Sequence, residues 1–292
     1  MKNLSSQLFT VSRRSWHPAA GNSIGGPLPA FVYCALLLTL TACAATPDTG
    51  DAELAALEAR AAEGDAPARL ALGRLYEDGE TVPADEAAAL RWYEAAAAAG
   101  SAEGALGAAL ILLAGDRTEA RRERAIALLD QAVEGGLPLA STRRADLHLR
   151  VDPDEAAPRR ARALYRDAAE QGLAEAQYKL GSMLAAGRGG ARDPRAASTW
   201  FRRAAEQGDS RAQLGLGDLY LLGVGVPENV ADALAWYRRA AEQGEYRAQS
   251  NLGDLLTLER YGSVRDLPAG ALWYRRAAEQ GYAHAQSRFA TL

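Results

Sequence analysis

Cysteine is nearly absent from this chain: only Cys34 and Cys43 occur among its 292 residues. Both lie in or beside one apolar run, so they cannot form a disulfide framework for the rest of the chain. Histidine is also rare, and beyond the N-terminal segment only His148 and His284 remain, without a cysteine near them. A zinc site needs three or four clustered ligands. The sequence therefore predicts no metal and no cofactor, and it favours a structural role for both histidines.

The motifs of common catalytic sites are missing as well. The glycine-rich stretch GRGGARD at 187–193 lacks the Lys-Ser/Thr pair of a phosphate-binding loop and is predicted to follow a helix. No Ser-x-x-Lys nucleophile motif occurs. Carboxylates are plentiful, but they recur periodically, as a solvated helix face requires: Glu170, Glu206, Glu242 and Glu279. We therefore expect a protein without catalytic residues.

The composition favours helix and disfavours nucleic acid as a partner. Alanine, leucine, arginine and glutamate dominate, whereas the β-branched residues, which lose more side-chain freedom in a helix, are scarce. The net charge is −4, and the first 42 residues contain no acid, so the remainder is more acidic still. A nucleic-acid-binding surface calls for a basic stripe instead.

One apolar run stands near the N-terminus, FVYCALLLTL at 31–40. It is too short to span a bilayer comfortably and is typical of a signal-peptide core. The LTAC that ends at Cys43 resembles the bacterial lipobox. That resemblance implies a signal peptide at 1–42, diacylglycerol and palmitoyl groups on Cys43, and, because Ala44 is not aspartate, sorting to the outer membrane. Residues 43–50 would form a flexible tether. A plain secretory signal or an uncut anchor are the alternatives.

Beyond that segment the sequence repeats. WYRRAAEQG occurs at 236–244 and again at 273–281, with the near-copy WFRRAAEQG at 200–208. The closing glycine recurs every 36 residues, with a last step of 37: Gly64, Gly100, Gly136, Gly172, Gly208, Gly244 and Gly281. A fixed period of this length is the signature of a repeat architecture.

Each period contains two helical patterns. The first places alanine, Leu-Gly and tyrosine or leucine on one face, as at Ala212, Leu216, Gly217 and Tyr220. Because glycine inside a helix costs about 1 kcal/mol relative to alanine, the recurrent Gly217 position predicts that a neighbouring helix approaches closely. A second glycine, followed by proline, predicts that the first helix ends at a residue with left-handed backbone conformation and that a new helix then begins, as in GVGVPEN at 223–229. The nonapeptide is then the second helix, with Trp-Tyr and an Ala pair on its buried side.

These positions resemble the Sel-one-like repeat of the tetratricopeptide-like superfamily over residues 54–292. The resemblance implies an all-α fold, an α-solenoid wound as a right-handed superhelix of 36-residue helix-turn-helix repeats. About six full units would be flanked by capping helices, and the repeat domain would span 51–292. The match weakens at 101–150, where Ala109 and Ala145 replace the mid-helix glycine. Looser packing or a departure from a regular superhelix is expected there.

In related arrays the first helices line an inner groove. The slots that the pattern leaves exposed on them are polar, and we expect them to hydrogen-bond an extended peptide or protein loop, although ordinary surface is equally compatible. The predicted groove residues are Arg69, Arg74, Gln177, Gln213, Asp218, Gln249 and Asp254, with Asp146 and Ser182 in the same register.

The resemblance implies a non-enzymatic scaffold or adaptor that binds a protein or peptide partner. With its lipid it would lie in the bacterial outer membrane facing the periplasm, supporting an envelope assembly such as exopolysaccharide export. One alternative is a periplasmic regulator that binds a sensor or an envelope enzyme. Another is a β-lactam-binding or hydrolysing repeat protein, which is disfavoured because the cysteine pair in each unit is missing.

Overall fold

The computed structural model describes residues 49–115, 118–151 and 154–292. The predicted signal peptide, Cys43 and most of the tether lie outside these residues. Internal contacts divide the chain at Pro47, and everything below belongs to the unit Pro47–Leu292. Its first helix begins at Thr49, so the last two residues of the expected tether are helical.

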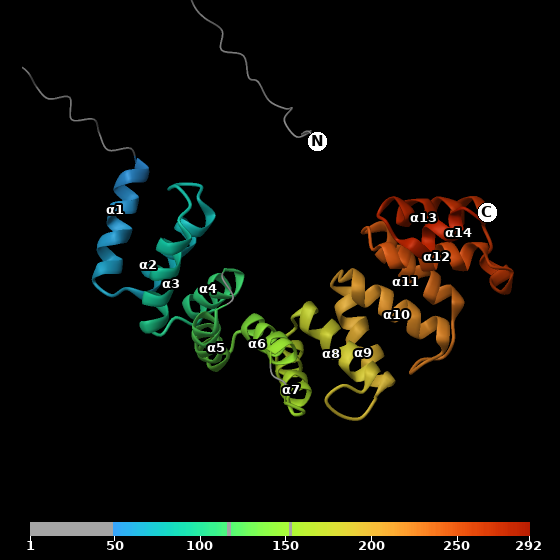
Figure 1. The fold of residues 1–292 in the computed structure, drawn as a ribbon, viewed down its shortest axis with the longest axis horizontal. Helices are drawn as coiled ribbons and strands as arrows, with labels where there is room; N and C mark the ends of the chain where they lie inside the picture. The colour runs from blue at the N-terminus through green and yellow to red at the C-terminus, as the bar shows by residue number, and fades with distance from the viewer. Residues whose placement is uncertain (1–48, 116–117, 152–153) are drawn as a thin grey trace, which may run out of the picture. The chain divides into compact units, whose positions relative to one another are not determined.

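The described residues form α-helices and one 3₁₀ helix, with no strand among them. The helices are α1 (Thr49–Ala62), α2 (Ala66–Asp78), α3 (Glu86–Ala98), α4 (Ala102–Ala114), α5 (Glu119–Glu134), α6 (Pro138–Val151), α7 (Ala157–Glu170), α8 (Ala174–Ala186), α9 (Pro194–Glu206), α10 (Ser210–Leu222), α11 (Val230–Glu242), α12 (Tyr246–Thr257), η1 (Glu259–Val264), α13 (Leu267–Glu279) and α14 (Ala283–Phe289). Each α-helix packs against the one before it and the one after it in the chain (Figure 1).

Two kinds of helix alternate along the chain. We call the even-numbered helices α2 to α14 the A helices and the odd-numbered helices α1 to α13 the B helices. An A helix and the B helix that follows it form one unit, and the six pairs from α2–α3 to α12–α13 correspond to the six predicted units. Helices α1 and α14 flank them as the expected half-units. The predicted all-α solenoid of helix pairs is therefore confirmed.

Glycines set the turns between helices. Gly244 closes its unit with φ of 92°, and nothing lies within 4 Å of where its side chain would be. This glycine is therefore needed for its left-handed backbone and not for space. Gly223 ends α10 in the predicted left-handed conformation. Most B helices then begin at a capping residue, as Asn229 does by accepting the backbone N–H groups of Ala231 and Asp232.

The glycine inside an A helix makes room for an aromatic ring. A Cβ at Gly217 would lie 2.6 Å from the ring of Tyr237, which is fully buried. The same relation joins three other pairs: Gly73 with Tyr93, Gly181 with Phe201, and Gly253 with Tyr274. The close approach that the sequence predicted is thus the contact of an A helix with the aromatic residue of its own B helix.

The middle of the chain closes its core with different residues. Ala109 and Leu129 are both fully buried in one cluster, so leucine and alanine there replace the aromatic ring and the glycine. Ala145 is likewise buried in the cluster that contains Tyr165. The looser packing expected at 101–150 is not seen at these positions.

Candidate partner-binding surface

The predicted groove residues separate into two groups. Gln177, Gln213 and Gln249 are buried, with exposed fractions of 3%, 4% and 4%. Their expected exposure is therefore wrong, because the A helix turns these positions toward the preceding B helix. Arg74 is exposed, and Asp218 and Asp254 are half-buried.

The buried glutamines donate to backbone carbonyls in the last turn of the preceding B helix, which also accept the N–H of the glycine that closes the unit. The Nε2 of Gln213 donates to the carbonyl oxygen of Ala205 at 3.2 Å. Its Oε1 accepts from Nε2 of Gln243 in the next B helix at 2.8 Å. The same two bonds recur one unit away on either side, with Ala169, Gln177 and Gln207, and with Ala241, Gln249 and Gln280. We call this chain of contacts the glutamine ladder.

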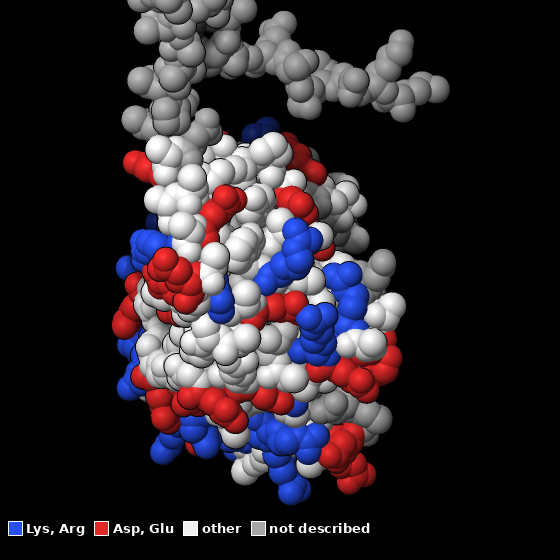
Figure 2. Space-filling view, turned by 90° about the vertical axis from the view of Figure 1, so that its left-hand side faces the viewer, with Lys and Arg blue, Asp and Glu red and all other residues white. Residues whose placement is uncertain are grey.

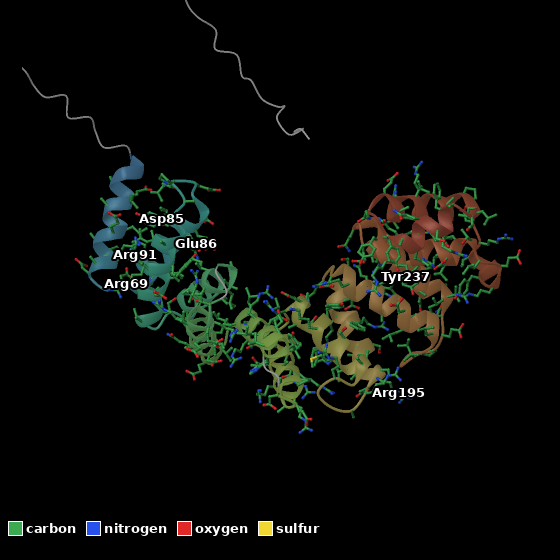
Figure 3. All side chains as sticks on the ribbon, in the orientation of Figure 1. Arg69, Asp85, Glu86, Arg91, Arg195 and Tyr237 are labelled. Carbon is green, nitrogen blue, oxygen red and sulfur yellow. The ribbon has the colours of Figure 1, made fainter. Side chains whose placement is uncertain are left out.

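Where the ladder lacks a glutamine, another side chain reaches the same carbonyl. Arg69, labelled in Figure 3, stands in the glutamine register and donates to Ala61 at 2.9 Å and to Ala95 at 3.2 Å. In the next unit the register holds an alanine, and Gln131 donates to the Ala97 carbonyl instead, at 2.7 Å. Arg69 is thus occupied by the fold and not by a partner.

The acids of the A helices bind the tyrosines of the B helices. Tyr237 donates its hydroxyl to Asp218 Oδ1 at 2.6 Å, and Tyr274 donates to Asp254 Oδ1 at 2.6 Å. Burial and the neighbouring carboxylate raise the pKa of the Tyr237 hydroxyl, which keeps it a proton donor. Where the ring has no hydroxyl, at Phe201, the corresponding A-helix residue is Ser182 and not an acid.

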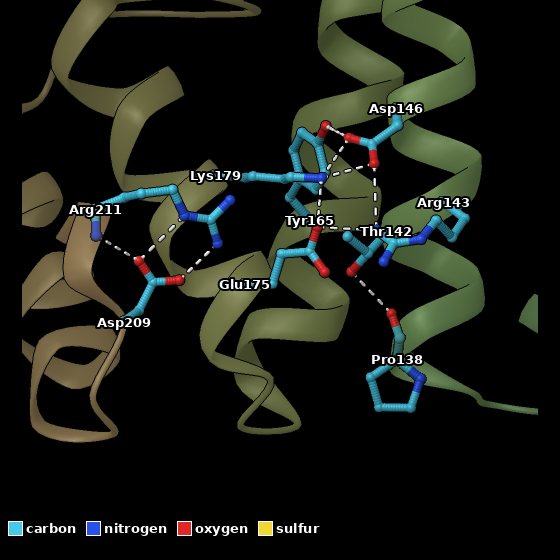
Figure 4. A network of polar contacts seen from close by, with 9 residues as sticks. All are labelled: Pro138, Thr142, Arg143, Asp146, Tyr165, Glu175, Lys179, Asp209 and Arg211. Atoms are coloured by element: carbon cyan, nitrogen blue, oxygen red, sulfur yellow. Dashed lines mark hydrogen bonds and ion pairs between the residues drawn. The ribbon is translucent and has the colours of Figure 1, made fainter. Parts of the chain in front are cut away.

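The equivalent acid Asp146 belongs to a network of charges (Figure 4). It accepts from Tyr165 at 2.5 Å and pairs with Lys179 at 2.6 Å. Glu175 pairs with Lys179 and with Arg143, each at 2.8 Å. Burial opposes ionisation of Glu175, but the hydrogen bonds and charges of these two cations outweigh it and lower the pKa of Glu175 to about 2. The network ties α6 to α8.

A hollow of about 180 Å³ lies where α10, α12 and η1 meet. Its lining combines acids and an amide with apolar and aromatic side chains: Asp218, Leu221, Leu222, Tyr237, Asn251, Asp254, Leu255, Arg260 and Tyr261. A larger hollow of about 460 Å³ shares Asp254 and Arg260 with it and extends to α14. Two predicted groove residues, Asp218 and Asp254, thus lie together in one surface depression. We call the smaller depression the Asp218 hollow.

Arg74 lines a separate hollow on α2, of about 470 Å³, with Leu70, Leu75 and Asp78. The structure does not bring Arg74 together with Asp218 and Asp254. On the face of the molecule shown in Figure 2, acidic and basic side chains are interspersed. That mixture offers no basic stripe on this face.

Among the described residues, no group of three or more His, Cys, Asp or Glu side chains is placed to hold a metal ion. No described helix is both long enough and apolar enough to cross a bilayer. His284 contacts Ser250 through Nδ1 at 3.0 Å, and His148 is buried.

Sequence reasoning missed two features of this surface. The glutamines of the repeated nonapeptide are ladder partners. Their separation from the A-helix glutamines, 30 residues in two pairs and 31 in the third, was a signal for the ladder. The second feature is η1, which brings Arg260 and Tyr261 to the hollow. The last step of 37 residues marks an insertion in that unit, but it does not indicate the insertion's shape.

Comparison with known proteins places these features in a family. The Sel1 repeat family model matches residues 66–101, 149–173, 174–209, 210–245 and 247–282, more than half of the chain. A Sel1 repeat protein from Oxalobacter formigenes is 32% identical, with a TM-score of 0.64, and the match covers 82% of this chain and 69% of that one. A protective antigen with an SLR fold, present in uropathogenic Escherichia coli strains, is 27% identical with a TM-score of 0.52, over 82% of this chain and 59% of that one. Among curated proteins, none matches.

Proposed function

Since this chain belongs to the Sel1 repeat family, whose members generally act as non-catalytic scaffolds that bind protein partners, we propose that it is a membrane-tethered interaction scaffold. One observation supports this most directly. The recurrent polar and aromatic side chains are occupied in contacts between units, as in the glutamine ladder, and within units, as in the Tyr–Asp pairs. Such contacts hold an extended surface in shape, which is what a repeat scaffold needs.

The binding surface of this scaffold is the A-helix side near the C-terminal units. The Asp218 hollow and its larger neighbour adjoin there, and Leu222 at the rim is 68% exposed. This leucine, at the rim of a depression lined by half-buried polar groups, gives a partner apolar surface to cover.

The tether is the lipid on Cys43, and its support comes from the sequence LTAC that ends there. Diacylglycerol with a further acyl chain gives firm anchoring, because each buried methylene adds about 0.8 kcal/mol. With alanine at position 44, the protein would lie in the outer membrane and face the periplasm. There it would support an envelope assembly such as exopolysaccharide export.

Crosslinking in cells tests the scaffold. A photoreactive residue at Leu222 or Asp254 is expected to capture a partner protein that mass spectrometry can identify. The matched control is Ala235, which is exposed on the B helix α11. Capture from Ala235 alone, or from none of these positions, would contradict the proposed surface.

Fractionation tests the tether separately. Cys43→Ser is expected to abolish acylation, as judged by mass spectrometry, and to release the protein from membranes. Cys34→Ser is the control and should leave the protein in the membrane fraction. If Cys43→Ser protein stays in that fraction, the lipid anchor is wrong, whereas the interaction surface is unaffected by that result.

A further inference from the structure

Three units have an aspartate at the same position of the A helix, and these aspartates differ in whether a cationic side chain is paired with them. Asp146 is paired with Lys179 at 2.6 Å, and Asp254 is paired with Arg288, 3.4 Å away. In both cases the cation comes from the next A helix and from the same position of the repeat. These two acids therefore have an internal positive partner.

Asp218 lacks that partner. The repeat position that holds Lys179 and Arg288 is Asn251 in its case, and the amide donates to Asp218 Oδ1 at 3.2 Å. The other donor to this oxygen is the neutral hydroxyl of Tyr237. Among the described residues, no cationic side chain forms an ion pair with Asp218. The intervening unit has Ser182 and Gly215 at these two positions, so acid and cation are absent there together.

Both hydrogen-bond donors to Asp218 Oδ1 are thus neutral. Burial raises the pKa of the Asp218 carboxyl, and the hydrogen bond from Tyr237, the positive charge of Arg247 and the hydrogen bond from Asn251 offset this only in part. Arg260 also lines the hollow, but its guanidinium is stacked over the ring of Tyr261, 4.7 Å from the centroid. A carboxylate in this state gains from any cation that enters the hollow.

The size and rim of the hollow indicate what kind of cation that is. Its volume of about 180 Å³ is below the ~300–1,000 Å³ usual for pockets that enclose free small molecules. It suits one side chain of a larger partner. The rim is apolar, with Leu222 68% exposed and Leu221 and Tyr261 beside it, so the neighbours of that side chain should be apolar too.

We propose that the Asp218 hollow binds an arginine or lysine side chain of a partner protein, flanked by apolar residues, in the place that Lys179 and Arg288 occupy in the other units. This inference rests on the proposed scaffold function and names the chemistry of its partner. The partner's cation would pair with Asp218 of α10 beside α12, where this chain has the neutral Asn251 in place of a lysine or arginine.

Peptide binding to the full chain in detergent tests the inference. The probe is a fluorescein-labelled Gly-Ser-Leu-Arg-Leu-Ser-Gly peptide, and its control carries citrulline, the neutral analogue of arginine. Fluorescence anisotropy should show that the arginine peptide binds about tenfold more tightly, as one charge-assisted hydrogen bond warrants. Asp218→Asn should remove that difference. Glu206→Gln, an exposed charge change on α9, should leave it.

Asn251→Lys provides the sharper variant. It supplies the missing cation from within the chain, so it should raise the melting temperature and abolish the arginine preference. Equal affinity for the two peptides, no binding of the arginine peptide, or an unchanged preference in Asn251→Lys would each overturn the proposal. Self-association of the chain that Asn251→Lys abolishes would do so too, by assigning the hollow to a second copy. If Leu222 captures a partner in cells but the arginine peptide binds no more tightly than the citrulline peptide, this inference alone is refuted and the scaffold stands.

Discussion

A single glycine position explains how four of the units close. At Gly217 the missing side chain lets the Tyr237 ring lie against the α10 backbone, and the same arrangement recurs in three other units. The glycine loses about 1 kcal/mol of helix propensity, and the buried ring more than compensates by the apolar surface that it removes from water.

We expect Gly217→Ala to lower the free energy of unfolding by about 1–3 kcal/mol, the usual cost of overpacking a closed core. The gain in helix propensity does not offset it, because the new methyl group would lie 2.6 Å from the Tyr237 ring. Urea unfolding followed by circular dichroism measures the change.

Gly217→Ala with Tyr237→Leu is the matched control, since this chain already pairs Ala109 with Leu129. The double variant should lose less stability than the two single changes together. Additive losses would show that the ring is not what the glycine accommodates.

At the scale of the helix, the glutamine ladder joins consecutive units. Gln213 bonds the end of the preceding B helix and receives Gln243 from the following one, so one side chain links three helices. The bond from Gln213 to the Ala205 carbonyl is buried, so water does not make up for its loss.

Gln213→Ala is expected to cost about 1 kcal/mol, because it removes the buried hydrogen bond to the Ala205 carbonyl, which keeps only the backbone N–H of Gly208 as a donor. Gln286→Ala removes the same type of bond, to Ala278, from an exposed side chain, and water can replace it. Gln286→Ala should therefore cost much less in the same urea titration. Equal costs for the two variants would contradict the ladder's role.

The ion-pair network links α6 to α8 in a pH-dependent way. The pKa of Glu175 is about 2 in the folded protein and about 4.3 in an unfolded chain. A lowered pKa stabilises the fold above the unfolded value, and this contribution is lost as the pH falls through the folded value. The stability that Glu175 contributes is therefore lost between about pH 4.3 and about pH 2.

Glu175→Gln should lower stability at pH 7 by about 1–2 kcal/mol, a figure discounted for solvent screening. The gap to the unchanged protein should close across that pH range in urea titrations at successive pH values. Glu206→Gln, exposed and on a B helix, should show a difference that stays flat with pH. A gap for Glu175→Gln that also stays flat would mean that the network does not control its ionisation.

Sequence periodicity predicted the helix pairs, because a helix end needs a left-handed glycine wherever it occurs and Gly244 or Gly223 mark those ends directly. The exposure of Gln213 was not predictable in the same way. Its partners lie in two other helices, and a polar residue on a helix suggests solvent until the neighbouring carbonyl is known. Asp218 and Asp254 were predicted as groove residues, but the Asp218 hollow also needs η1, whose shape no repeat position encodes.

At the scale of the whole array, each unit contacts mainly its neighbours in the chain. Stability in such an array is a sum of unit and interface contributions. A change at one end should then be felt near that end, and the C-terminal helix α14 offers a direct test. Its Ala285 is buried in one cluster with Tyr274 and Ala277, so α14 covers the last B helix.

Deletion of residues 283–292 should uncover Tyr274 and remove the bond from Arg288 to its hydroxyl. Hydrogen exchange measured by mass spectrometry should then show faster exchange in α12 and α13, because their apolar contacts face water, while α2 and α3 keep their protection. The full chain under identical conditions is the reference. Equal acceleration in α2 and α3 would mean that the array unfolds as one cooperative block, and the nearest-neighbour description would fail.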